Sequence, residues 1–311
     1  MSRKSEVDRA IGFQGPSRIP IWVDGGNLRN SDVLTYDLSM GDEDNPRLSE
    51  WGFERLRSPS GDWLIPKAAT LPEWQDVDAY QAPPMNSARR LAGIAKAATV
   101  CGDRYRIASF GMSGFSIYRA LRGAELSAVD FLIESDRFIE LMELIFDFEV
   151  AFFDLLSRKG FHAIEFCDDW GDRATSRVTL SLWRTMLKAY YARQFRRAKE
   201  SGLHVWFSTP SQCAEFFGDL KEIGADVVRV DAPYDVELAS LGRAFRGKLC
   251  FAVRLDEIVG ETNDDLSLVQ HIYECLATKD GGFIATVADG VNADRINKIV
   301  RLVNKLTPPM I

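Results

Sequence analysis

The sequence predicts an α/β protein with the architecture of a (β/α)8 TIM-type barrel, preceded by an irregular N-terminal extension. Three observations support this prediction. From residue 86 onward, short apolar runs typical of buried strands alternate with periodic helical stretches, as in parallel βα units. Polar residues, mostly aspartates, follow nearly every apolar run. The length of 311 residues exceeds most single cores but is usual for one α/β barrel.

The chain divides into two parts of one expected domain, residues 1–311. Residues 1–85 are irregular and rich in Gly, Pro, Asp and Trp, with one clear strand at Ile19–Asp24. Two adjacent prolines then interrupt the chain, and regular βα units cover residues 86–311. The sequence contains no internal repeat that would suggest a second domain.

Six further strands are expected in the regular part, between helices such as those predicted at 182–201 and 266–278. These strands are expected at 104–110, 162–167, 204–207, 226–230, 248–253 and 282–287. With the early strand this makes seven, so a closed barrel requires an eighth from an irregular segment. A doubly wound open sheet is the alternative, but no GxGxxG or GxxxxGK[ST] motif supports it.

Composition excludes several classes of protein. A net charge of −7 argues against a nucleic-acid-binding surface, which needs clustered Lys and Arg. No apolar stretch has the roughly 18 residues of a membrane span, and the polar segment Met1–Ala10 is unlike a secretion signal. The five cysteines are widely spaced and form no CxxC pair. We therefore expect a cytoplasmic protein with reduced thiols, no membrane contact and no nucleic-acid partner.

Catalytic side chains of such a barrel lie at the C-terminal ends of its strands, where this sequence concentrates carboxylates. Any single Asp there is explained by turn formation or helix capping. Several converging on one face can raise one another's pKa and supply an acid or base, or hold a divalent cation. The candidate catalytic residues are Asp168, Asp169, Asp231 and Asp256. The candidate substrate-binding residues near them are Asp24, Ser208, Arg254 and Asp289.

Two local segments add further substrate-binding candidates. Trp170 follows the paired aspartates and can form the wall of a pocket, although a packing role for it is the alternative. The glycine-rich run 110–115 precedes a helix whose N-terminus favours an anion, and Arg119 lies further along that helix. From this run we select Met112, Ser113 and Phe115.

The three histidines are expected to be structural. His162 and His204 each begin a strand, at the end of the barrel away from the chemistry, and His271 lies within a charged helix. None has a second His or a Cys at metal-ligand spacing, so we expect no metal site.

Several segments in order resemble the uroporphyrinogen-decarboxylase-like superfamily. The strongest are Phe110–Gly123 and the Asp-Asp-Trp-Gly sequence 168–171, and weaker likenesses extend over nearly the whole chain. The resemblance implies a (β/α)8 barrel with a pocket at its C-terminal face, and a homodimer. The superfamily includes porphyrinogen decarboxylases, which use no cofactor, and zinc-dependent methyltransferases that serve corrinoid proteins.

The sequence departs from both branches at positions that carry their chemistry. Where the methyltransferases have zinc ligands, this chain has Ser208, Pro210 and Asp289. We therefore expect no zinc and no other bound cofactor. Where the decarboxylases have an Arg-rich signature after the first strand, only Arg29 remains, which the resemblance makes a substrate-binding residue.

Three functions follow as hypotheses. The first is a cofactor-independent decarboxylase or lyase that acts on a small carboxylated substrate in the barrel mouth. The second is a corrinoid-linked methyltransferase or O-demethylase component without the usual zinc ligands, which needs a corrinoid protein as partner. The third is a non-catalytic binding or scaffold protein.

Overall fold

The computed structural model describes most of the chain. The described residues are 1–26, 29–42, 44–45, 47–57, 63–64, 66, 68–100, 102–133, 136–170, 178–209, 214–231, 233, 237–260 and 264–306.

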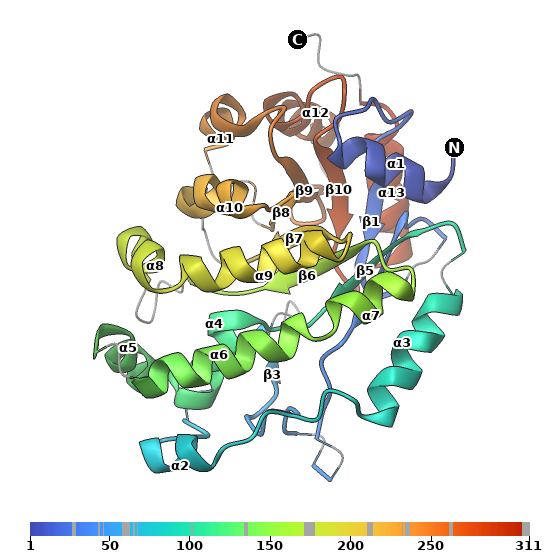
Figure 1. The fold of residues 1–311 in the computed structure, drawn as a ribbon. Helices are drawn as coiled ribbons and strands as arrows, with labels where there is room; N and C mark the ends of the chain where they lie inside the picture. Colours follow the sequence, from blue (N-terminus) through green and yellow to red (C-terminus); the bar gives the residue numbers. More distant parts are fainter. Residues whose placement is uncertain are drawn as a thin grey trace.

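Eight parallel strands form the main sheet in the order β1-β10-β9-β8-β7-β6-β5-β2, so that sequential strands are neighbours around a nearly closed barrel (Figure 1). The predicted TIM-type architecture is confirmed. The strands are β1 (Ile21–Val23), β2 (Val33–Asp37), β5 (Tyr105–Ser109), β6 (Ala163–Cys167), β7 (His204–Ser208), β8 (Val227–Val230), β9 (Cys250–Arg254) and β10 (Phe283–Val287). The missing eighth strand is β2, which lies in the segment predicted to be irregular.

The seam between β1 and β2 is closed largely by side chains. The amide of Asp32 donates to the carbonyl of Ile21 (2.7 Å), and the Asp32 carboxylate accepts from the Ile21 amide (2.8 Å). The hydroxyl of Ser31 accepts from the Val23 amide (3.0 Å), and Arg18 holds Asp32 through both terminal nitrogens. These bonds satisfy strand amides that have no ladder partner.

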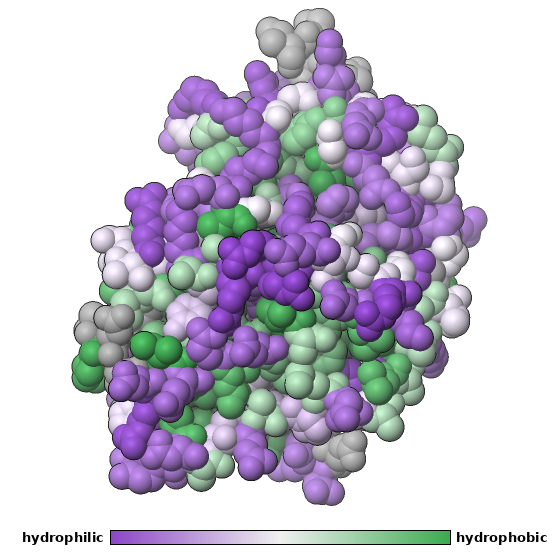
Figure 2. Space-filling model, in the orientation of Figure 1, coloured by the Kyte–Doolittle hydropathy of each residue, from purple (hydrophilic) through white to green (hydrophobic). Residues whose placement is uncertain are grey.

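Helices cover the outside of the barrel. They pack against the strand side chains that point away from the barrel interior. The helices are α1 (Arg3–Ile11), α2 (Trp74–Ala79), α3 (Ala88–Val100), α4 (Gly114–Arg122), α5 (Ala124–Ile133), α6 (Asp136–Val150), α7 (Phe153–Arg158), α8 (Leu180–Met186), α9 (Lys188–Glu200), α10 (Phe217–Ile223), α11 (Leu238–Phe245), α12 (Asp265–Leu276) and α13 (Ala293–Val303). In Figure 1, α6 and α9 run side by side across the face in view. The outer side of α9 exposes Arg196, Arg197 and Lys199. Figure 2 shows hydrophilic side chains on the surface where this helix crosses the face in view.

The N-terminal helix closes the bottom of the barrel. Val7, Ala10 and Ile11 of α1 pack against inward-facing strand residues such as Trp206 and Ile284. Ser2 caps the helix by accepting a hydrogen bond from the Ser5 amide. The prediction of an irregular N-terminal part therefore misses this helix as well as β2. A short antiparallel pair, β3 (Leu56–Arg57) and β4 (Trp63–Leu64), also belongs to this part.

No helix in the described part of the chain is long and apolar enough to cross a membrane.

Candidate active site

The inside of the barrel changes from apolar to polar towards the C-terminal ends of its strands. Strand side chains alternate between two faces, so residues two places beyond the inner-core residues Trp22, Val227 and Ala252 also point inward. The inward-facing polar residues of this upper layer are Asp24, Thr35, Ser109, Glu165, Cys167, Ser208, Arg229, Asp231, Arg254 and Thr286. Branched apolar residues usually fill a barrel, so this polar layer is the candidate active site.

Glu165 is the most deeply placed acid of this layer. It lies in the middle of β6 and is 3% exposed. Its Oε1 accepts a hydrogen bond from the hydroxyl of Ser208 on the neighbouring β7. Burial raises the pKa of Glu165 to about 7, although the charge of Arg229 and the Ser208 hydrogen bond act in the opposite direction. Near neutral pH this carboxyl can therefore donate or accept a proton.

Arg229 places a positive charge in the same layer. Its Nε donates to Asp231 (2.6 Å), its Nη1 lies 3.6 Å from Oδ2 of Asp24, and its guanidinium lies over the Trp22 ring at 5.0 Å. Burial alone would lower the pKa of Arg229, but Asp231, Asp24 and Glu165 together raise it. The group is therefore a permanent cation, and three acids surround it.

A thiol and a hydroxyl complete the wall beside Glu165. The Oγ of Ser109 lies 3.5 Å from the Sγ of Cys167. Burial raises the pKa of the Cys167 thiol well above its usual range, so it stays protonated at neutral pH.

Arg254 and Asp256 form the rim above β9 and β10. Arg254 donates through Nε to Asp256 (3.1 Å), and its Nη2 lies 3.1 Å from Glu257. Asp256 also accepts from the amide of Ala288 (2.9 Å), which ties the end of β9 to that of β10. Both predicted residues thus lie at the mouth, where they pair with each other.

Asp289 lies against Gly25, in the turn that directly follows Asp24 at the end of β1. Gly25 has φ +69°, a conformation that favours glycine, and a Cβ there would lie 1.8 Å from Oδ1 of Asp289, so a side chain at this position would displace the Asp289 carboxylate. Asp289 also accepts from the Gly290 amide (2.7 Å). The predicted residue Arg29 is exposed beyond this turn, and its carbonyl accepts from Arg3.

Asp168 faces away from the barrel interior and caps α4. It accepts from the amides of Phe115 (2.9 Å) and Ser116 (2.8 Å), and the hydroxyls of Ser116 and Tyr191 also donate to it. It is 1% exposed, and burial raises its pKa to about 6. The anion predicted at this helix N-terminus is therefore a side chain of the chain itself. These contacts explain Asp168 without a catalytic role, which stays a prediction.

A second buried carboxylate lies beside this cap. Glu149 of α6 accepts from the amide of Gly114 (3.0 Å) and from the side chain of Gln194. Burial raises its pKa to about 8, and the nearby Asp168 adds to the rise.

Four other predicted residues are packed outside the mouth. Ser113, Phe115, Arg119 and Trp170 are each at most 4% exposed. The Trp170 indole donates to the Tyr191 hydroxyl (3.0 Å) and packs against the ring of Phe207 at 4.7 Å. Arg119 donates to the carbonyl of Asp169 (3.2 Å). Trp170 is thus a core residue here, and the packing alternative describes it better than a pocket wall.

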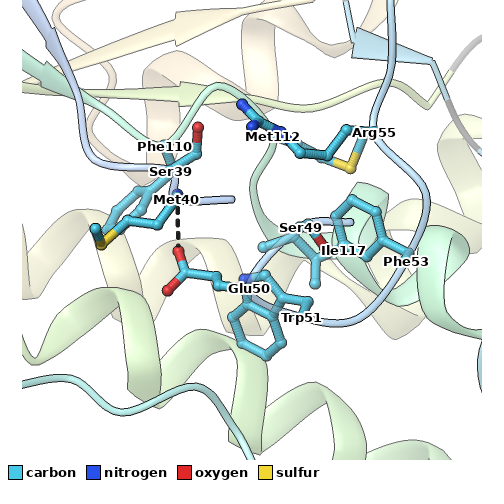
Figure 3. Close-up of a pocket in the computed structure, with 10 residues that line it drawn as sticks. All are labelled: Ser39, Met40, Ser49, Glu50, Trp51, Phe53, Arg55, Phe110, Met112 and Ile117. Carbon is cyan, nitrogen blue, oxygen red and sulfur yellow. Dashed lines mark hydrogen bonds between the residues drawn. The ribbon is translucent and has the colours of Figure 1, made fainter. Parts of the chain in front are cut away.

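Met112 lines a small cavity at the rim between the ends of β2 and β5. Figure 3 shows Met112 and Arg55 on one side of this cavity and Glu50 and Trp51 on the other. Its volume is about 20 Å³, enough for about one water molecule. In this conformation the cavity admits no organic substrate.

The donor set does not fit zinc. Ser208 is bonded to Glu165, while Asp289 packs on Gly25 at the exposed end of the barrel. Within the described residues, no group of three or more His, Cys, Asp or Glu side chains has the geometry to hold a metal ion. Pro210 lies outside the described part of the chain, as do residues 171–177.

Glu165 and Arg229 are the site residues that the sequence interpretation missed. That interpretation considered positions after each strand, whereas both residues lie within strands. A charged residue inside an otherwise apolar strand was the available signal, because burying a charge is costly unless it has a partner or a function.

Comparison with known proteins gives a family and a fold. Residues 61–301 match the family described as uroporphyrinogen decarboxylase (URO-D). No curated protein matches the sequence. A methyltransferase from Methanosarcina mazei has a similar structure, with a TM-score of 0.67 at 9% sequence identity over 98% of this chain and 99% of that chain. A D-psicose 3-epimerase aligns with a TM-score of 0.45 at 10% identity over 74% of this chain and 84% of that chain.

Proposed function

The chain belongs to the uroporphyrinogen decarboxylase (URO-D) family, and on that premise we propose that it is a cofactor-independent decarboxylase of a small carboxylic acid. The observation that carries the proposal is the presence of Glu165 and Arg229 together in the polar layer of the barrel. Decarboxylation needs a cation to position the carboxylate and an acid to protonate the carbon that carbon dioxide leaves. These two residues supply both.

Arg229 is the group that binds the carboxylate. Asp231 accepts a hydrogen bond from the Nε of Arg229 (2.6 Å), and the Nη1 of Arg229 lies 3.6 Å from Oδ2 of Asp24. A guanidinium held at one nitrogen presents its remaining N–H groups in a planar fork that matches a carboxylate. Asp24 and Asp231 orient the fork and keep it charged.

Glu165 is the proton donor. With a pKa of about 7, roughly half of the molecules carry the protonated acid at neutral pH. Ser208 holds one carboxyl oxygen, so the proton is directed from the other. A general acid works best when its pKa lies near the working pH.

Substitution of these two residues tests the proposal. A panel of 2-oxo acids, 3-oxo acids, malonates and hydroxybenzoates is screened for release of carbon dioxide. With the acid that reacts, we expect Glu165→Gln to lower kcat about a hundredfold, because the proton donor is lost. Arg229→Gln is expected to raise KM, because the carboxylate loses its charged partner.

The matched control is Glu143→Gln, which changes an acid on the surface of α6 that pairs with Arg193. It should leave both constants unchanged. Full activity of Glu165→Gln, or release of carbon dioxide from no acid in the panel, would contradict the proposal.

Methyl transfer is the second candidate function, and the fold match to the Methanosarcina methyltransferase favours it. This reaction would need a corrinoid protein to dock at the barrel mouth. Methylation of added cob(I)alamin by the protein and a panel of methyl donors would support it. A binding protein without catalytic activity also remains a proposal. Assembly as a homodimer is a further proposal, which sedimentation analysis would test.

A further inference from the structure

Four polar atoms inside the barrel have no hydrogen-bond partner among the described residues. One is Nε1 of Trp206 on β7, and the other three lie across the interior from it. These three are Nε1 of Trp22, Oγ1 of Thr286 and Oγ1 of Thr35. Trp22 and Thr286 are each 1% exposed. A buried donor without an acceptor costs about 1–3 kcal/mol, so native proteins rarely keep one without a reason. Two such donors side by side indicate that an acceptor from outside the chain belongs there.

The three atoms come from neighbouring strands, β10, β1 and β2. Trp22 and Thr286 are direct partners in the β1–β10 register, and their side chains share the inner face. Thr35 follows on β2, across the seam that Ser31 and Asp32 close. Together they form one side of the barrel interior, with Trp22 directly below the polar layer, and we call these three residues the donor wall.

The donor wall lies opposite Glu165. In the strand order of the barrel, β6 is diametrically opposite β10, and β7 is opposite β1. The rings of Trp22 and Trp206 meet across the interior at 5.5 Å between centroids, so side chains of opposite strands come into reach of one another. A small molecule on Arg229 would therefore have Glu165 on one side and the donor wall on the other.

Loss of carbon dioxide leaves an electron pair that must go to an acceptor. Without a cofactor, the substrate itself must hold that pair, and a carbonyl at the 3-position does so as an enolate. Donors aimed at the developing oxyanion are the usual means of stabilising it. The Trp22 indole can only donate, and the threonine hydroxyls are free to donate. These are the donors that an enolate oxygen requires.

On the basis of the proposed decarboxylase function, we propose that the substrate is a 3-oxo acid and that Trp22 and Thr286, with Thr35, bind its keto oxygen as the enolate forms. The bond between the carboxylate carbon and C2 breaks, and its electron pair forms the C2–C3 double bond of the enolate. Carbon dioxide leaves, and Glu165 protonates C2. The products are a ketone and carbon dioxide, and Glu165 recovers its proton from water.

The charge of the layer agrees with a neutral keto group at the donor wall. Asp24, Asp231 and Glu165 already surround Arg229, while Arg254 is paired with Asp256. A second carboxylate would add negative charge to a site that has an excess of it. A keto oxygen needs only the neutral donors, and its charge develops in the transition state, where binding accelerates the reaction.

Arg229 covers part of this wall in the structure, since its guanidinium lies over the Trp22 ring. Movement of this side chain towards a substrate carboxylate is the rearrangement that brings the keto group onto the donor wall.

The experiment uses the full chain and the acid panel described above. We expect release of carbon dioxide from 3-oxo acids with a single carboxylate, such as acetoacetate or 3-oxopentanoate, above the spontaneous rate. Thr286→Val keeps the side-chain shape but removes the hydroxyl, and should lower kcat about a hundredfold with little change in KM. Thr286→Ser should restore most of the activity. Thr99→Val removes an exposed hydroxyl and is the matched control.

The outcomes separate this inference from the proposed function. If carbon dioxide is released only from acids without a 3-oxo group, the inference fails and the decarboxylase proposal stands. If Thr286→Val and Trp22→Phe are both folded and fully active, the donor wall binds ordered water only, and the inference fails. If no acid reacts, the proposed function fails and the inference with it.

Discussion

At the scale of single residues, the site depends on how neighbours adjust Glu165. Burial raises its pKa, while Arg229 and the hydroxyl of Ser208 moderate the rise. Without these two neighbours the pKa of Glu165 would be higher, and the carboxyl would be a weaker proton donor at neutral pH. The polar side chains around Glu165 therefore adjust its pKa for proton transfer.

Replacement of Ser208 tests this adjustment. Ser208→Ala removes a hydrogen bond that stabilises the carboxylate, so the pKa of Glu165 should rise above 7. Titration of 13C-labelled glutamate by NMR measures this shift directly. Because Glu165 acts as the protonated acid, decarboxylation should also persist to higher pH. Ser109→Ala should shift the pKa less, since the Ser109 hydrogen bond has the smaller effect; a fall in the pKa would contradict the assignment.

At the scale of elements, the start of α4 depends on one carboxylate from another strand. Asp168 satisfies two of the amides that a helix N-terminus leaves without partners, and it also receives the hydroxyls of Ser116 and Tyr191. The helix thus begins where β6 ends, which fixes the packing of α4 on the barrel.

Asp168→Ala should therefore lower the free energy of unfolding by about 3 kcal/mol, because several buried donors lose their acceptor at once. Urea denaturation measures the change. Asp169→Ala, which removes a neighbouring acid at the same turn, should cost much less. If Asp168→Ala were as stable as the wild type but inactive, the catalytic role predicted from the sequence would be correct instead.

At the scale of the whole molecule, the two ends of the barrel have different tasks. The lower end is closed by α1 and holds His162 and His204 beside Tyr105, whose hydroxyl lies 2.6 Å from Nδ1 of His204. The structural role predicted for both histidines agrees with this position. The upper end carries the polar layer. The lower end of the barrel therefore stabilises the fold, and the upper end carries the candidate active site.

The buried histidines destabilise the folded state in mild acid, and this contribution opposes that of the buried carboxyls Glu149, Glu165 and Asp168, whose raised pKa values stabilise the folded state as pH falls. Burial lowers the pKa of His162 to about 4 and also lowers the pKa of His204. At these two histidines the folded state therefore binds fewer protons than the unfolded state, whose histidines titrate near 6.5, so their contribution to stability is lost as pH falls from about 6.5 towards 4. For His162 the loss is on the order of 3 kcal/mol. Urea denaturation as a function of pH measures it.

His162→Asn preserves an acceptor for the Arg106 amide and should reduce this pH dependence. His271→Gln, on the charged helix α12, should leave it unchanged. If His162→Asn changed the pH dependence of stability no more than His271→Gln does, the explanation would be wrong.

The sequence by itself determined the barrel, because alternating strand and helix patterns are local properties that can be recognised in the order of the residues. It also determined the mouth residues Asp24, Ser208, Asp231, Arg254 and Asp256, since the end of a strand is visible in the sequence. Strand β2 was missed because its edge position at the seam leaves it partly polar, and α1 because its apolar face is narrow.

Only the tertiary structure decided which acids face the interior. The direction of a side chain depends on strand parity and register, and these follow from pairing with strands far away in the chain. Asp168 faces outward and caps α4, and Trp170 packs in the core outside the barrel. Glu165 and Arg229 face inward, where they form hydrogen bonds with Ser208 and Asp231. Burial then sets the pKa of each acid, and burial is a property of the folded molecule alone.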